Sequence, residues 1–274
     1  VFLTECPRDA LQGIKTFIPT DVKVKYLQSL LRVGYDILDF GSFVSPKVVP
    51  QMRDTHEVIK QLDLSETKTK LLAIVANERG AVEALSYDQI SYIGYPFSIS
   101  ENFQMRNTNT TIEESLLLLN RLVERTVGVN QELVVYLSMG FGNPYGDPWS
   151  PALVADWVKR LVDIGVNRIS LSDTVGLAQA DTISELFEYL NMVHPDVFFG
   201  AHLHAKPNEV ISKIKAAYAG GCRAFDSAIR GLGGCPMAKD SLTGNVPTEK
   251  LLSFLASQKS EFSVNMLYFE AAYN

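Results

Sequence analysis

Hydrophobic and polar positions alternate along the chain in two kinds of stretch. Short runs rich in apolar and β-branched residues, such as 71–76 and 132–138, are typical of strands that are buried on both faces. Longer stretches between them repeat their apolar positions at the spacing of a helix, for example over 111–127. Eight such alternations can be counted, which predicts strand–helix units that feed a parallel sheet.

The predicted strands cover 1–5, 35–40, 71–76, 89–95, 132–138, 168–173, 197–202 and 223–227, and the predicted helices include 20–33, 52–62, 111–127, 151–164, 181–192, 208–219 and 247–257. A doubly wound open sheet is the alternative, but no strand is followed by a GxGxxG phosphate turn, and eight units suffice to close a barrel. The prediction is therefore one α/β domain over residues 1–274, a (β/α)8 barrel with its active site at the C-terminal ends of the strands.

Local signals mark where several helices begin and end. Ser150 is the expected cap of one helix, Thr111 and Glu114 form the pattern of a capping box, and Thr20 is the expected cap of the first long helix. Glycines follow several of the periodic stretches, as Gly34 does. These signals support the predicted boundaries.

Composition narrows the class of protein. Of the 274 residues, 46% are hydrophobic and 20% are charged, which is enough apolar material for one large core. The net charge of −6 and the lack of a dense Lys/Arg cluster argue against nucleic acid as a partner. No apolar run approaches the length of a bilayer span, so we expect no membrane insertion.

The cysteines and the start of the chain bear on its compartment. Cys6, Cys222 and Cys235 are odd in number and lack the close pairing of a zinc knuckle or a redox motif. Val1 opens directly into strand-like sequence, without a basic and then apolar leader. A reducing cytoplasm is therefore the expected location, unless residues before Val1 have been removed.

Polar residues at the predicted strand ends are the first candidates for chemistry, because barrel active sites form there. Arg8 and Asp9 follow the first strand, Asp39 ends the second and Asp173 ends the sixth. Each has a plainer interpretation: a surface ion pair for Arg8 and Asp9, a turn former for Asp39, and a helix cap for Asp173.

The seventh predicted strand leads into His202 and His204. Residues two apart on a strand point to the same side, so both imidazoles can face the barrel axis and bind one metal ion. The alternative is a pair of structural histidines. With only four histidines in the chain, this spacing at this strand end favours the metal site.

A glycine-rich segment, residues 231–236 (GLGGCP), follows the eighth strand and carries Cys235. No Gly-Lys-Ser/Thr follows, so a mobile loop is favoured over a phosphate cradle. A thiol on such a loop suggests catalysis, and inert packing is the alternative.

Together these segments resemble the hydroxymethylglutaryl-CoA lyases of the metal-dependent lyase and acyl-synthase barrel superfamily. The resemblance covers essentially the whole chain and is strongest at 7–12 (PRDALQ), 42–47 (SFVSPK), 49–52 (VPQM), 172–176 (SDTVG), 202–204 (HLH) and 231–236. The glycine-rich segment separates these lyases from the related synthases. The resemblance implies cleavage of 3-hydroxy-3-methylglutaryl-CoA, or a close β-hydroxy acyl-CoA, to acetyl-CoA and acetoacetate. It also implies a place in leucine catabolism and a possible homodimer. The apolar tail 264–269 could pack on the barrel or on a partner subunit.

The resemblance assigns roles position by position. It implies that Mg²⁺ or Mn²⁺ is held by Asp9, His202, His204 and Asn245, a donor set without thiolate that suits these ions better than structural zinc. It also implies three further groups of roles: Arg8 holds the thioester carbonyl and the enolate, Cys235 on the lid returns a proton, and Asp173 or Asp39 takes the proton of the 3-hydroxyl. The implied substrate-binding residues are Gln12, Ser42 and Ser170.

The chain departs from the family pattern at several positions. Ala10 stands where glycine is usual and Asp39 where glutamate is usual, which shortens that side chain by one methylene. Ala205 follows His204 in place of aspartate, and the segment from Cys235 to Asn245 is one residue longer. These differences leave the reaction type intact and weaken the substrate assignment.

Two other functions stay open. One is an acyl-CoA condensing synthase resembling isopropylmalate or citramalate synthase, although those usually carry a C-terminal regulatory region and this chain stops just after the barrel. The other is a catalytically inactive metal-binding relative, which the departures at Asp39 and Ala205 would favour.

Overall fold

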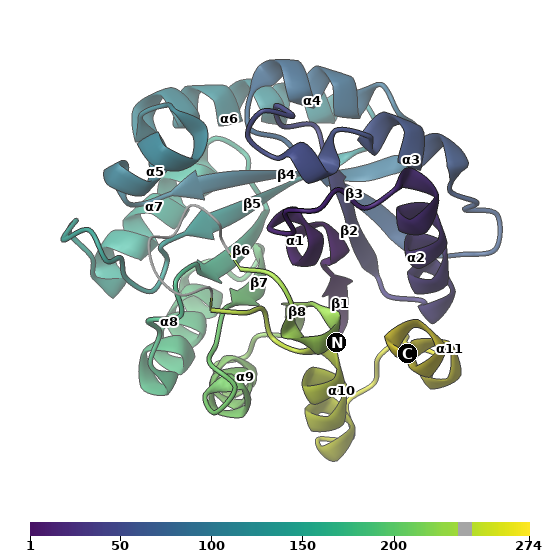
Figure 1. Cartoon of the computed structure of the whole chain (residues 1–274). Coiled ribbons are helices and arrows are strands. Elements are labelled where there is room, and N and C mark those ends of the chain that lie inside the picture. Colours follow the sequence, from purple (N-terminus) through teal and green to yellow (C-terminus); the bar gives the residue numbers. More distant parts are fainter. Residues whose placement is uncertain (235–242) are drawn as a thin grey trace.

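Eight parallel strands form a closed barrel in sequence order, and helices surround it (Figure 1). The structure, a computed structural model, describes residues 1–234 and 243–274. The strands are β1 (Phe2–Glu5), β2 (Ile37–Ser42), β3 (Lys70–Ile74), β4 (Ile90–Ser98), β5 (Glu132–Ser138), β6 (Arg168–Asp173), β7 (Phe198–Leu203) and β8 (Ala224–Ser227). The predicted (β/α)8 barrel is confirmed.

The helices of the described residues are α1 (Pro7–Gln12), α2 (Thr20–Val33), α3 (Thr55–Gln61), α4 (Glu78–Leu85), α5 (Glu101–Thr108), α6 (Ile112–Val127), α7 (Pro151–Asp163), α8 (Ala180–Val193), α9 (Val210–Ala219), α10 (Thr248–Ser257) and α11 (Met266–Tyr273), with 3-10 turns η1 (Pro50–Met52) and η2 (Ile229–Gly231). The predicted helices agree within a few residues. The helix predicted from residue 52 begins only at Thr55, because the separate turn η1 precedes it. The short helices α1, α4, α5 and α11 were not among the predictions.

The predicted caps are confirmed with one exception. Ser150 accepts a hydrogen bond from the backbone of α7, and Thr111 and Glu114 form the reciprocal capping box of α6. Thr20 is not a cap, because the capping position of α2 is Pro19. The Thr20 hydroxyl instead donates to Asp54 at 2.8 Å and ties α2 to the segment before α3.

Alternation along the strands divides the core into two layers. Outward-facing residues such as Leu38, Val135 and Leu171 pack against the helices, whereas Ile37 and Val134 fill the interior of the barrel. The direction of a side chain therefore depends on its odd or even place in the strand. The same rule decides which strand-end residues reach the mouth.

The C-terminal tail packs mainly on the barrel's own helices. Helix α11 lies beside α2 (Figure 1), and Val264 and Phe269 are buried there. Leu267 is 73% exposed, so part of the apolar surface of the tail stays uncovered in this chain. None of the helices in the described ranges is long and apolar enough to cross a membrane.

Glu5 is a fully buried carboxyl that joins β1 to the end of the barrel. Its side chain accepts hydrogen bonds from the Ile229 backbone N–H at 2.8 Å and from the Thr248 hydroxyl at 2.6 Å. Burial raises its pKa to about 8, although both hydrogen bonds oppose the shift. Glu5 thus connects β1 to η2 and α10, which flank the segment that carries Asn245.

This raised pKa predicts that Glu5 makes stability fall with rising pH. Between its ordinary pKa of 4.5 and about 8, the folded chain keeps a proton that the unfolded chain has lost. The stability from this group is therefore present below about pH 4.5 and is lost as the pH rises towards 8, by up to about 1.4 kcal/mol per pH unit.

Glu5→Gln should remove this dependence, because a neutral amide has no proton to lose. Urea unfolding at pH 5 and pH 8.5 should show the variant gaining stability relative to the wild type at the higher pH. Glu57→Gln, at an exposed position of α3, is the matched control and should follow the wild type. The same pH dependence in Glu5→Gln and the wild type would contradict the prediction.

Candidate metal centre at the mouth of the barrel

A cavity of about 500 Å³ opens at the C-terminal ends of the strands, which is the size range of small-molecule sites. Its wall includes most of the polar residues that the sequence singled out. They are Arg8, Asp9, Gln12, Ser42, His202 and His204, and they meet apolar side chains that include Ile74, Val49, Phe17 and Phe103. The cavity is therefore the place to test the predicted site.

Asp9, His202 and His204 converge at this mouth. Each offers a ligand atom within 4.8 Å of the others, and the two imidazole rings lie 5.2 Å apart between centroids. Asp9 lies in the first turn of α1, whereas His202 lies in β7 and His204 directly follows that strand. The two histidines border the same cavity, as their spacing predicted.

Asn245 joins this group from the segment before α10. Its side-chain nitrogen donates to Asp9 at 2.6 Å and to the Leu232 carbonyl at 2.8 Å. Gly233 is required beside it: its φ is +94°, and a Cβ there would lie 2.7 Å from the Asp9 carbonyl oxygen. Gly233 of the glycine-rich segment and Asn245 thus both lie against Asp9. Cys235 itself lies outside the described residues.

The protonation of His204 suits metal binding. Burial, and to a lesser extent the neighbouring His202, lower the pKa of His204 to about 4. Its Nε2 atom is buried and has no hydrogen-bond partner among the described residues. Burial would raise the pKa of Asp9, but the positive charge of Arg8 and the two histidines hold it below its ordinary value. A neutral imidazole and an ionised carboxylate are the forms that bind metals.

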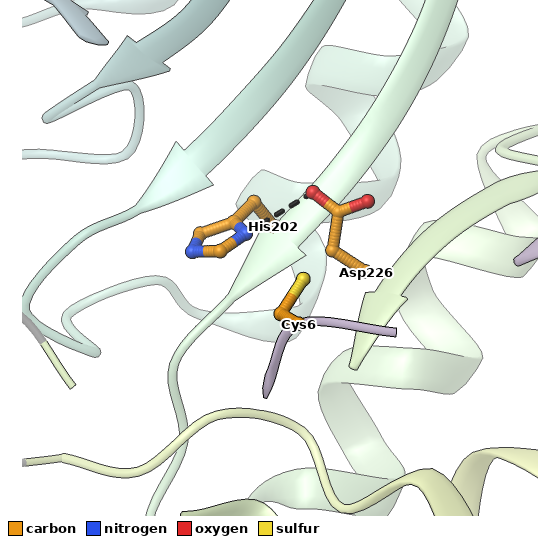
Figure 2. Close-up of side chains that lie close together, drawn as sticks. All are labelled: Cys6, His202 and Asp226. Carbon is orange, nitrogen blue, oxygen red and sulfur yellow. Dashed lines mark hydrogen bonds and ion pairs between the residues drawn. The ribbon is translucent and has the colours of Figure 1, made fainter. Parts of the chain in front are cut away.

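Asp226 orients His202 from the neighbouring strand β8. The carboxylate lies 3.1 Å from the Nδ1 atom of His202, and Figure 2 shows the second ring nitrogen on the far side of the ring. Burial lowers the pKa of His202, but the hydrogen bond and charge of Asp226 outweigh it and the pKa is raised. A carboxylate behind a histidine sets which nitrogen faces a metal. Sequence analysis missed Asp226, although alternation along β8 could have identified it as an inward-facing carboxylate.

Arg8 is buried and bonded to its surroundings on three sides. Its Nε and Nη2 atoms donate to Asp39, and its Nη1 atom donates to Asp9 and Gln12, both at 3.1 Å. Gln12 in turn donates to Asp9 at 2.6 Å. The interpretation of Arg8 and Asp9 as a surface ion pair is therefore wrong, because both are at least 90% buried.

Asp39 faces the interior of the barrel behind Arg8. Burial raises its pKa to about 6 despite the ion pair with Arg8. It does not border the cavity, and its oxygens are engaged by the Arg8 guanidinium. Asp39 is therefore neither a turn former nor placed to touch a substrate. Its position allows it to orient the Arg8 guanidinium.

Asp173 points away from the cavity, contrary to the prediction that it faces the reaction. Ser170 and Ser172 take the inward positions of β6, so Asp173 faces the helices. There it accepts a hydrogen bond from Lys213 at 2.6 Å and from the Ala178 backbone at 3.2 Å. The alternative interpretation of Asp173 as a helix cap is also wrong, since the capping position of α8 is Gln179.

Lys213 is the buried partner that sequence analysis missed. Besides Asp173, its ammonium donates to the carbonyl oxygens of Gly176 at 2.9 Å and His204 at 3.0 Å. It lies on the buried face of α9 with Val210 and Ile214. A lysine on an otherwise apolar helix face was the available signal.

The two serines differ in position. Ser42 borders the cavity, because a β-bulge between Asp39 and Gly41 shifts the register of β2 by one residue. Ser170 lies one layer deeper, where its hydroxyl donates to Asp226 at 3.0 Å. The prediction that Ser170 lines the substrate cavity is not met, and Ser172, two residues along the strand, lines it instead.

The closed barrel carries a buried carboxylate, two imidazoles and an arginine at its mouth. These features define the class of the protein as a (β/α)8-barrel enzyme with a candidate metal centre. The family model described as HMGL-like matches residues 2–272, and the chain belongs to this family. The predicted resemblance is confirmed.

Individual relatives agree with this family. The chain is 32% identical over 262 residues to human cytoplasmic 3-hydroxy-3-methylglutaryl-CoA lyase, covering 95% of this chain and 70% of that protein. It is also 32% identical to the mitochondrial hydroxymethylglutaryl-CoA lyase of Rattus norvegicus, covering 95% of this chain and 79% of that protein.

Solved structures give the same result. The HMG-CoA lyase of Bacillus subtilis has a TM-score of 0.92 at 30% identity, covering all of this chain and 91% of that chain. The HMG-CoA lyase of Acinetobacter baumannii in complex with coenzyme A and 3-methylmalate has a TM-score of 0.91 at 27% identity, covering 99% and 88%.

Proposed function

We propose that this chain is a lyase that cleaves 3-hydroxy-3-methylglutaryl-CoA to acetyl-CoA and acetoacetate. One observation carries the proposal: in a member of the HMGL-like family, Asp9, His202 and His204 converge at the mouth of the barrel beside Arg8. The reaction breaks the bond between C2 and C3, turns the 3-hydroxyl into a ketone and leaves an enolate at C2. The alkoxide that forms when the hydroxyl loses its proton and the developing enolate are both negatively charged, and both need stabilisation.

The donor set supports Mg²⁺ or Mn²⁺ as cofactor. A carboxylate and two imidazoles, with the Asn245 amide against Asp9, offer oxygen and nitrogen ligands without thiolate. The Nε2 atom of His204, which has no hydrogen-bond partner within residues 1–234 and 243–274, is a nitrogen that a metal ion would coordinate. Rotation of the Asn245 amide would present its oxygen. When bound, such an ion would polarise the 3-hydroxyl of the substrate and lower its pKa.

Arg8 is placed to stabilise the enolate. Four of its five N–H groups are engaged: Nε–H and one Nη2–H by Asp39, and the two Nη1–H groups by Asp9 and Gln12. In the part of the chain that the structure describes, no contact uses the remaining Nη2–H. Because the other donors hold the guanidinium in place, this N–H is a preorganised donor for the thioester oxygen.

The proton of the 3-hydroxyl needs an acceptor at the cavity wall. Asp39 and Asp173, the carboxylates that the sequence predicted for this step, do not border the cavity. Proton transfer requires hydrogen-bond reach, which makes geometry the first criterion. We therefore assign this step to the group of Asp9, His202 and His204, and give Asp39 the task of orienting Arg8.

Cys235 stays the proposed donor of the proton that completes acetyl-CoA. Cys235→Ser should fold and bind metal but lose most turnover, because a hydroxyl is a much weaker acid than a thiol. Steady-state cleavage and the metal content of the purified variant measure the two properties. Near wild-type turnover would remove the thiol from the mechanism.

One assay separates the lyase from its alternatives. The chelator-treated chain is incubated with 3-hydroxy-3-methylglutaryl-CoA, with and without added Mg²⁺ or Mn²⁺, and acetoacetate is measured. A lyase forms acetoacetate only with metal. In a parallel incubation with acetyl-CoA and a 2-oxo acid, a condensing synthase would instead release free CoA, and an inactive relative would form neither product. Absence of acetoacetate under all conditions would overturn the proposal.

The remaining proposals concern the acyl-CoA partner, the location of the protein, its oligomeric state and its pathway. An acyl-CoA partner is supported by the coenzyme A in the Acinetobacter baumannii complex and by Lys15 and Arg53 on the cavity wall, which are cations available to an anionic carrier. Relatives carry both cytoplasmic and mitochondrial names. A cytoplasmic location, a homodimer and a place in leucine catabolism stay predictions.

A further inference from the structure

A second group of metal-ligating side chains lies directly beneath the candidate centre. Cys6, His202 and Asp226 offer a sulfur, a nitrogen and an oxygen within 4.8 Å of one another. They come from the end of β1, from β7 and from β8, and Figure 2 shows the thiol pointing towards the imidazole and the carboxylate. The proposed function uses neither Cys6 nor a thiolate ligand, so the thiol has no role in it.

The thiol of Cys6 is held only weakly by the protein. Its one hydrogen bond within the described residues is a long one, to the Thr4 carbonyl at 3.9 Å. Cys6 is fully buried, the Asp226 side chain is 9% exposed and the His202 side chain is 12% exposed. Cys222 behaves differently, because its sulfur contacts the Ala224 carbonyl at 3.0 Å.

The charge around Cys6 favours a cation. Burial raises the pKa of the Cys6 thiol most, the negative charges of Asp226, Asp39 and Asp9 raise it further, and the positive charge of Arg8 lowers it. A buried thiolate in this setting would be costly unless a positive ion accompanied it. A donor set of sulfur, imidazole and carboxylate selects Zn²⁺ and similar thiophilic ions over Mg²⁺.

We propose that Cys6, His202 and Asp226 form a second, thiophilic metal site whose occupation by Zn²⁺ disables the first. His202 belongs to both groups. Its Nδ1 atom faces Asp226, and its other ring nitrogen is left to bind a metal ion together with Asp9 and His204. A Zn²⁺ ion between Cys6 and Asp226 takes Nδ1 and moves the imidazole proton to the other nitrogen, which can then no longer bind the catalytic ion.

The proton balance is simple. Starting from the neutral His202 imidazole, Zn²⁺ binding releases one proton, from the Cys6 thiol, and the proton on the imidazole only changes nitrogen. The consequence for catalysis rests on the proposed function, whereas binding at the second site does not. The structure thus assigns Cys6 to inhibition by thiophilic ions.

Cobalt reports on this site without any activity assay. Co²⁺ added to the chelator-treated full chain should produce the near-ultraviolet charge-transfer band of a thiolate–Co²⁺ bond. Cys6→Ser should abolish the band, whereas Cys222→Ser and Cys235→Ser, the matched controls, should keep it. Zn²⁺ should also bind Cys6→Ser at least about tenfold more weakly than the wild type.

A measurement on the wild type covers the case in which Cys6→Ser fails to fold. Under mildly denaturing conditions, Zn²⁺ should slow alkylation of Cys6 several-fold and leave that of Cys222 unchanged, as followed by mass spectrometry. A cobalt band that persists in Cys6→Ser, or that disappears only in Cys235→Ser, would overturn the proposal. Alkylation of Cys6 at the same rate with and without Zn²⁺ would also overturn it. An inactive chain that still shows the band would contradict the lyase and support the second site.

Discussion

Replacing His204 with alanine should empty the metal centre and lower kcat/KM on the order of 1,000-fold, because Lewis-acid stabilisation is worth several kcal/mol and each 1.4 kcal/mol is about tenfold in rate. The Nε2 atom of His204 is buried without a partner among the described residues, and burial keeps the imidazole neutral. Removing it therefore removes a ligand and leaves the surrounding hydrogen bonds nearly intact.

The measurements are the Mn²⁺ content after dialysis and the steady-state cleavage of 3-hydroxy-3-methylglutaryl-CoA. His194→Ala at the end of α8 is the matched control, since His194 does not border the cavity. It should retain one ion per chain and full turnover. A His204→Ala variant with wild-type metal content and wild-type kcat/KM would refute the assignment of the centre.

Breaking the buried ion pair of Asp173 and Lys213 should also have a large effect, on both stability and turnover. The comparison distinguishes a structural role of Asp173 from a catalytic one. Either Asp173→Asn or Lys213→Met leaves an unpaired buried charge, which costs about 3–5 kcal/mol of stability. Both should also weaken metal binding, because Lys213 holds the His204 carbonyl. The double variant should recover much of the stability and of the turnover, since it buries no unpaired charge.

The double variant decides the role of Asp173. If Asp173 accepted the proton of the substrate, activity would stay lost in the double variant even where stability returns. Urea unfolding and kcat/KM of the single and double variants give the two answers. Lys159→Met, which breaks the exposed pair with Asp163, is the control and should cost no more than about 1 kcal/mol.

The fold was predictable because its determinants are local. Apolar runs, helical periodicity and side-chain caps such as Ser150 act within a few residues, and they set the order and bounds of most elements. Thr20 shows where local signals fail: its hydroxyl is used by Asp54, which is distant in the sequence, and Pro19 takes the capping position. The short helix α1 escaped prediction because six residues carry too little periodicity.

The candidate site was predictable where one element carries it. His202 lies near the end of β7 and His204 directly follows the strand, and their spacing already placed both on one side. That Asp9 and Asn245 join them followed from the family resemblance, because 236 positions separate the two residues in the chain. The resemblance also named Arg8, whose four engaged N–H groups only the folded chain displays.

By itself the sequence determined the barrel, its order of elements and the two-histidine motif, because each depends on spacing within one segment. Only the tertiary structure decided which strand-end groups meet. It turned Asp173 outwards to Lys213, placed Asp39 behind Arg8 and brought Asp226 and Cys6 to His202. The physical reason is that strand register, the bulge in β2 and closure of the barrel set these contacts, and they depend on pairings between distant parts of the chain.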